Sequence, residues 1–74
     1  MNPTTPKTKF ELLAAFGLRT TVTMEVTADG GPVTLTGMIH ELGHEDGVGD
    51  SFYGKFYDNA GEGRLVDCYF GRFK

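Results

Sequence analysis

An alternating segment followed at once by a tight-turn signal most constrains the fold of this chain. Residues 21–27 alternate polar and apolar side chains, which is the period of a strand with one buried face. Asp29-Gly30-Gly31 follows directly, and two-residue hairpin turns favour such residues because they require positive φ. The alternation resumes at Val33, Leu35 and Ile39. The segment therefore predicts an antiparallel hairpin, which commits the chain to a sheet.

A short helix is predicted before this hairpin, over residues 9–16. Thr8 and Glu11 have the spacing of a capping box, and Gly17 is a plausible stop. The remaining predicted elements are two aromatic-rich strands and the turn between them: residues 52–57, 65–73 and 58–63. Together these segments predict a mainly β (α+β) fold. A short N-terminal helix lies on a four-stranded, strongly bent antiparallel meander or partial small barrel.

The length of the chain, 74 residues, leaves room for one small domain. Residues 1–7 are predicted as a flexible lead-in because they hold two prolines, and residues 8–74 as a single domain. The longest apolar run, residues 12–16, is far short of a membrane span. The one cysteine, Cys68, suits a reducing compartment. With no recognisable secretion signal, the expectation is a cytoplasmic protein without membrane contact.

Charge is distributed unevenly along the chain. The two ends hold all seven Lys and Arg residues, whereas residues 20–54 hold none. An acidic centre is poorly suited to binding phosphates unless folding gathers the basic ends together. Ordinary surface solubility explains the same pattern equally well. The acids of the middle are Glu25, Asp29, Glu41, Glu45, Asp46 and Asp50.

A zinc-protease motif is present in His40-Glu41-Leu42-Gly43-His44, which matches H-E-x-x-H. With Gly47 and Asp50 the match extends to H-E-x-x-H-x-x-G-x-x-D, which resembles the metzincin pattern with aspartate as third ligand. On a helix, this spacing places both imidazoles on one face, with the glutamate beside the metal as general base. A zinc-binding or zinc-hydrolase module using His40, Glu41 and His44, with Asp50 as a further ligand, is therefore one alternative.

The residues before this motif argue against a helix. Residues 32–37 are β-branched and carry Gly37 where the helix would be building. In a strand, His40 and His44 would lie about 13 Å apart at about 3.3 Å per residue, too far to share zinc. We therefore expect residues 40–50 to be a polar connection between two strands. The expectation is then no enzyme activity, no catalytic residue and no cofactor.

Three segments resemble the Sm-like family of small β-barrels: Val22-Thr23-Met24-Glu25-Val26, Asp29-Gly30 and Leu35-Thr36-Gly37-Met38-Ile39. The resemblance implies a bent barrel that forms rings by pairing edge strands. It also implies binding of single-stranded RNA. An RNA-binding ring is therefore a second alternative, and it requires the basic residues to converge on one face. Those residues are Lys7, Lys9, Arg19, Arg64 and Arg72.

The favoured interpretation is a small non-enzymatic binding module that acts through protein–protein contacts. An acidic inhibitor or adaptor of a nucleic-acid-handling protein of mobile-element type fits the acidic centre, by analogy only. The partner is another protein, or a second copy of this chain paired along an edge strand. The predicted binding residues are four acids and two aromatic anchors: Glu41, Glu45, Asp46, Asp50, Tyr53 and Tyr57.

Overall fold

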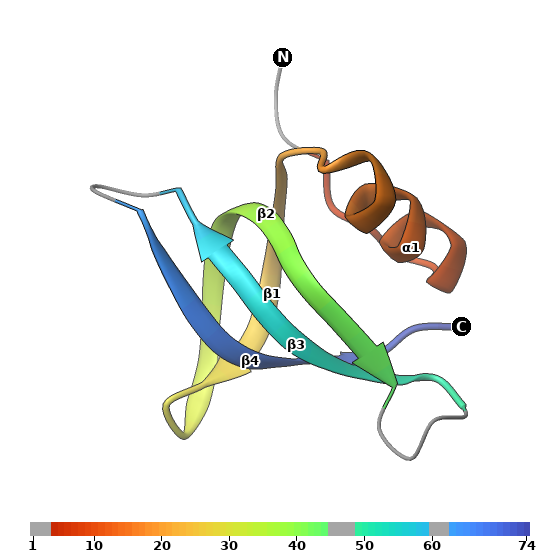
Figure 1. Cartoon of the computed structure of the whole chain (residues 1–74). Coiled ribbons are helices and arrows are strands. Elements are labelled where there is room, and N and C mark those ends of the chain that lie inside the picture. The colour runs from red at the N-terminus through yellow and green to blue at the C-terminus, as the bar shows by residue number, and fades with distance from the viewer. Residues whose placement is uncertain (1–3, 45–48, 60–62) are drawn as a thin grey trace.

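The computed structural model describes residues 4–44, 49–59 and 63–74. Its strands pair antiparallel in the ring order β1-β2-β3-β4, and β1 returns to β4 at Thr27 and Tyr69 (Figure 1). The predicted mainly β architecture, one short helix with four bent antiparallel strands, is confirmed. The elements are α1 (Lys9–Leu18), β1 (Val22–Ala28), β2 (Gly31–His44), β3 (Ser51–Asp58) and β4 (Arg64–Arg72).

The helix begins where its capping box predicts. The Glu11 amide donates to the Thr8 hydroxyl over 3.1 Å, and the Thr8 amide donates to the Glu11 carboxylate over 3.2 Å. The predicted stop at Gly17 is wrong, because the helix continues to Leu18. Arg19 instead takes the left-handed conformation that ends it, with φ 54° and ψ 40°. A left-handed non-glycine residue is uncommon and indicates that further contacts hold it.

The predicted hairpin is confirmed between β1 and β2. Ala28 and Gly31 are the last paired residues, so Asp29 and Gly30 form a two-residue turn. Both have positive φ, 52° and 86° respectively. This is the turn geometry whose twist matches that of the flanking strands, and Asp-Gly adopts it at little cost.

Strand β2 is much longer than predicted. The prediction of a polar connection from residue 40 is wrong for residues 40–44, which continue the strand and pair with β3. The first part of β2 pairs with β1, and the part from Gly37 onward pairs with β3. A β-bulge at His40 interrupts the second pairing, since Ile39 and Glu41 face consecutive residues of β3. One long, bent strand thus connects the two halves of the ring.

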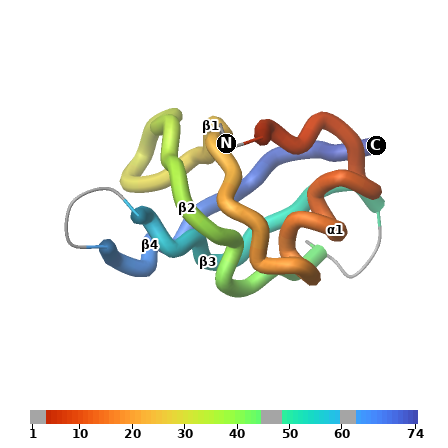
Figure 2. Tube along the Cα trace, turned by 90° about the horizontal axis from the view of Figure 1, so that it is seen from above, coloured from red at the N-terminus to blue at the C-terminus, as the bar shows by residue number. Residues whose placement is uncertain are grey.

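The apolar core lies inside the ring, and α1 packs against it. Phe52, Phe56 and Ile39 are fully buried, and α1 contributes the fully buried Leu12. Figures 1 and 2 show α1 at one end of the ring and the β1–β2 hairpin at the other. No helix in the described part of the chain is long and apolar enough to cross a membrane.

Both ends of the described chain are tied to this core. The Thr23 amide donates to the Thr4 carbonyl over 2.9 Å, beside the start of β1. At the other end, the Lys9 amide donates to the Lys74 carbonyl over 2.8 Å, and Phe73 is buried beside Phe52. The helix start is therefore joined to the end of the chain.

Candidate functional site

The outer surface of β2, β3 and β4 carries three rows of side chains. Directly paired residues of neighbouring strands point to the same face, so the register defines each row. We call this surface the tyrosine face. Its rows are Met38–Tyr57–Leu65, Glu41–Lys55–Asp67 and Gly43–Tyr53–Tyr69.

All three tyrosines of the chain lie on the tyrosine face. Tyr53 and Tyr57 are 50% and 36% exposed, and Leu65 beside them is 49% exposed. The neighbouring Phe52 and Phe56 point the other way and are fully buried. In strand β3 the two phenylalanine rings therefore fill the core, and the two tyrosine rings, which carry a hydroxyl, are exposed to solvent.

The two exposed tyrosines predicted as anchors are held against glycines. A Cβ on Gly43 would lie 3.5 Å from the Tyr53 ring, and a Cβ on Gly63 would contact the Tyr57 hydroxyl. Rings that cover glycines of an adjacent segment are restrained without being buried. Ordered aromatic side chains lose little conformational entropy on binding, which favours their use in contacts.

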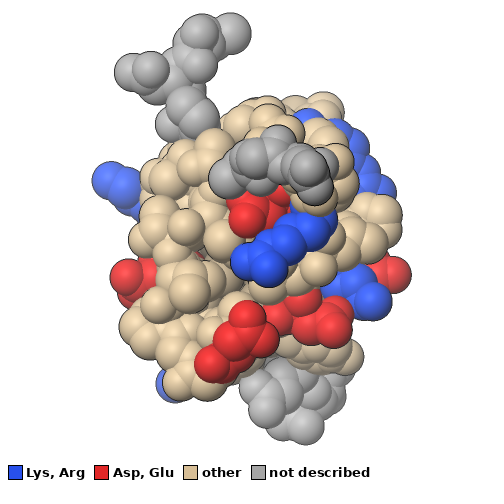
Figure 3. Space-filling model, turned by 90° about the vertical axis from the view of Figure 1, so that its left-hand side faces the viewer, with Lys and Arg blue, Asp and Glu red and all other residues tan. Residues whose placement is uncertain are grey.

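Charges on the tyrosine face are mixed. Lys55 lies opposite Glu41 and forms an ion pair with Asp67 over 3.6 Å, so the central row alternates in sign. On the side of the molecule shown in Figure 3, acidic and basic side chains are likewise interleaved. A mixed row contributes specificity more than affinity to a contact.

Of the four acids predicted for binding, the two described ones, Glu41 and Asp50, lie apart. Glu41 lies on the tyrosine face. Asp50 pairs with Lys9 over 3.1 Å at the start of α1, and its carbonyl accepts from the Phe73 amide. Glu45 and Asp46 lie outside the described residues. The structure thus groups Glu41 with Tyr53 and Tyr57 and places Asp50 at another point on the molecule.

The alternative in which the H-E-x-x-H motif lies on a helix is wrong, because His40, Glu41 and His44 all lie in β2. His44 packs on Phe52 with the ring centroids 4.5 Å apart, and its Nδ1 is buried with no hydrogen-bond partner within the described residues. Glu41 lies opposite Lys55, and His40 is at the bulge. Across residues 4–44, 49–59 and 63–74, no three His, Cys, Asp or Glu side chains are arranged to hold a metal ion.

Cys68 also lacks the surroundings of a nucleophile. It packs partly buried against the core. Burial, together with the nearby Asp67 charge, raises the pKa of its thiol to about 11. The reactive thiolate is therefore scarce at neutral pH.

The basic residues required by the RNA-binding alternative are divided between different places. Lys9 lies near Arg72, because Asp50 pairs with Lys9 and also accepts from the Phe73 amide, whereas Arg64 is at the other end of β4. Arg64 and Arg72 are the two end residues of β4, and Lys9 lies at the start of α1. Lys9 and Arg64 pair with Asp50 and Asp58, respectively. The five basic residues do not share one strand end or one helix face.

No protein-family model, curated protein or solved structure matches this chain. The candidate site is therefore inferred from the geometry of this chain alone. Sequence reasoning identified Tyr53, Tyr57 and Glu41 but missed Tyr69, Leu65 and Met38 of the same face. A local signal was present for Tyr69, since Phe-Tyr at residues 52–53 and 56–57 is mirrored by Tyr-Phe at residues 69–70.

Proposed function

We propose that this protein is a non-enzymatic binding module that contacts another protein through the tyrosine face. The supporting observation is the placement of all three tyrosines on one outer face, two of them flanking Lys55 and each at least 36% exposed. Tyrosine is enriched at protein interfaces because its ring buries a large area while its hydroxyl finds a hydrogen-bond partner.

A narrower version of this proposal is an acidic inhibitor or adaptor of a nucleic-acid-handling protein. Glu41 and Asp67 support it, because both are exposed and both flank the tyrosines. In this version Tyr53 and Tyr57 anchor the contact, and the two carboxylates meet basic side chains of the partner. The version predicts that the captured partner binds DNA or RNA when tested alone.

The test is quantitative affinity capture from cell extract, with and without nuclease treatment, on the tagged protein and the double variant Tyr53→Ser/Tyr57→Ser. The matched control is Phe10→Ser, which removes an 80% exposed aromatic ring from α1. We expect a protein that the wild type and the control capture equally and the double variant does not. Loss of a pair of aromatic anchors should weaken the affinity by about thirtyfold or more.

Two outcomes would contradict the proposal. One is that every captured protein binds the double variant as well as the wild type. The other is that capture depends on RNA and disappears with nuclease, which would favour the RNA-binding alternative. Circular dichroism of each variant checks that folding is intact, and we expect no change because the three side chains replaced are exposed.

A further inference from the structure

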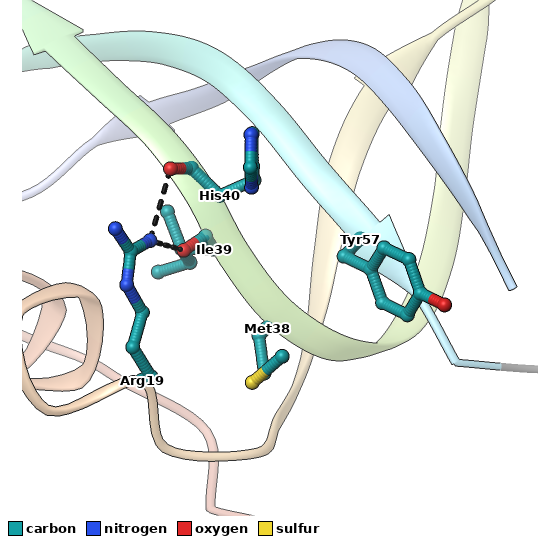
Figure 4. A pocket seen from close by; sticks show the side chains of 5 residues that line it. All are labelled: Arg19, Met38, Ile39, His40 and Tyr57. Carbon is teal, nitrogen blue, oxygen red and sulfur yellow. Dashed lines mark hydrogen bonds between the residues drawn. The ribbon is translucent and has the colours of Figure 1, made fainter.

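A pocket of about 380 Å³ opens at the edge of the tyrosine face, between that face and the end of α1. Its size lies within the range of about 300–1,000 Å³ that holds small ligands. Met38 and Tyr57, which form one row of the tyrosine face, also line the pocket, so the two surfaces are continuous. The lining residues are Arg19, Met38, Ile39, His40 and Tyr57 (Figure 4).

Backbone carbonyls at the β-bulge of β2 hold the guanidinium of Arg19, which is the cation of this pocket. Nη1 of Arg19 donates to the carbonyls of Ile39 and His40, each over 2.9 Å. The guanidinium carbon lies 4.8 Å from the centre of the Phe16 ring, which restrains the side chain from a second direction. The backbone of Arg19 is held as well, because its amide donates to carbonyls of the last turn of α1. The guanidinium is thus held in place before any ligand arrives.

The remaining donors of Arg19 are not used by these bonds. A guanidinium has five N–H groups, and the two bonds to β2 engage only Nη1. Figure 4 shows the second terminal nitrogen of Arg19 pointing away from β2. Arg19 forms no ion pair within the described part of the chain. A preordered guanidinium with free donors and no acidic partner favours a carboxylate ligand.

The rest of the lining favours an apolar group beside that carboxylate. Met38, Ile39 and the ring of Tyr57 supply apolar surface, and Figure 4 shows the Tyr57 hydroxyl directed away from Arg19. His40 also lines the pocket, and its imidazole can donate a further hydrogen bond. Arg19 is the only Lys or Arg residue among the lining residues, which suits a singly charged carboxylate better than a phosphate.

We propose that this pocket binds the C-terminal residue of the partner protein when that residue is apolar. The cation and the apolar wall line the same small pocket, so both groups are best supplied by one residue. A C-terminal residue carries a carboxylate directly beside its side chain, and capture of this group is a known mode of peptide recognition. The inference rests on the proposed function, because it specifies the partner that the tyrosine face contacts.

The test is an NMR titration of the labelled full chain with N-acetyl-phenylalanine, which has a free carboxylate, and separately with its carboxamide. We expect shifts at the Met38 and Ile39 methyl groups and at Nε–H of Arg19, with a Kd on the order of 1 mM for a ligand this small. The carboxamide should bind about tenfold more weakly because it has no charge for Arg19. Adenosine monophosphate is the comparison for a phosphate ligand.

Two variants test the position of the site. Arg19→Gln removes the cation and should weaken binding of N-acetyl-phenylalanine by about tenfold. Because this variant also perturbs the bulge, Met38→Trp provides a second test: it fills the pocket and leaves Arg19 in place. Phe10→Ser is the matched control, since Phe10 is exposed and does not line the pocket, and it should bind N-acetyl-phenylalanine like the wild type.

Three outcomes would overturn the inference: no shifts at these three residues, equal affinity for the carboxamide, or tighter binding of adenosine monophosphate. Unchanged binding to Met38→Trp would also overturn it. The two experiments have separate readouts, because the titration detects a small ligand in the pocket, whereas affinity capture detects a whole protein on the tyrosine face. Failure of the titration with capture still dependent on Tyr53 and Tyr57 would reject the C-terminal ligand and leave the proposed function in place.

Discussion

At the scale of single residues, Gly37 and Gly17 differ in whether the structure leaves room for a side chain. Gly37 is buried where β2 passes from β1 to β3, and a Cβ there would overlap the Tyr57 carbonyl and lie 2.9 Å from the Asn59 amide nitrogen. Gly17 lies in the last turn of α1, and a Cβ there would meet nothing within 4 Å. Close backbone approach therefore requires glycine at one position and not at the other.

We accordingly expect opposite signs for the same substitution. Gly37→Ala should destabilise the protein by about 3 kcal/mol or more, because the overlap is with backbone that cannot move alone. Gly17→Ala should stabilise it by about 0.5–1 kcal/mol, because alanine restricts the unfolded chain and fits the helix. Urea denaturation followed by circular dichroism measures both. Equal effects of the two substitutions would show that the β2–β3 approach is looser than described.

At the scale of elements, α1 depends on its cap because its sequence is otherwise a weak helix. It has ten residues, below the length at which an isolated helix is stable in water, and no basic residue in its last turn. The reciprocal bonds of Thr8 and Glu11 satisfy backbone amides at its start. Packing of Leu12 into the core supplies the rest of its stability.

Removal of this cap should therefore be measurable in the whole domain. Thr8→Ala should lower the free energy of unfolding by about 1 kcal/mol and the Tm by roughly 4–8 °C. Thr8→Ser is the matched control, since it keeps the hydroxyl and should remain close to wild type. Thermal denaturation distinguishes them, and a Tm for Thr8→Ala equal to that of Thr8→Ser would contradict a capping role.

At the scale of the whole molecule, the ring separates the residues of the H-E-x-x-H motif. His44 packs on the core residue Phe52, whereas Glu41 lies in an outer row with Lys55. The two histidines of the motif lie about 13 Å apart along a strand at about 3.3 Å per residue, too far to share an ion whose bonds are about 2.1 Å long. Within the described residues, His40, Glu41 and His44 therefore do not have the one-face arrangement that a helical H-E-x-x-H motif gives them.

We expect zinc to have no effect on the folded protein. Native mass spectrometry with added zinc should show the metal-free mass, and the Tm should change by less than about 1 °C, because a ligand stabilises only the state it binds. The variant His44→Ala serves as control, since any weak surface binding should persist in it. One zinc per chain that is lost in His44→Ala would contradict this expectation and would support a zinc site that uses His40, Glu41 and His44.

Local patterns predicted most of the elements and half of the candidate site. The capping box at Thr8, the Asp29-Gly30 turn and the alternation of β1 depend on neighbours within a few residues, so each was visible in the sequence. Tyr53 and Tyr57 were predicted because aromatics on both faces of a strand leave some of them outside the core. The continuation of β2 through His44 was missed, because His40 and Glu41 are polar and lead through Gly43 into an acidic, glycine-rich stretch, which also fits a loop.

The sequence by itself determined where the strands lie, apart from residues 40–44 of β2, where the hairpin turns and where the helix begins, because these features arise from interactions over a few residues. Only the tertiary structure decided the register of β2 with β3 and the bulge at His40. Both depend on contacts between residues far apart in the chain, which a local pattern does not record. That register aligns the three tyrosines on one face and brings Arg19 to the carbonyls of Ile39 and His40.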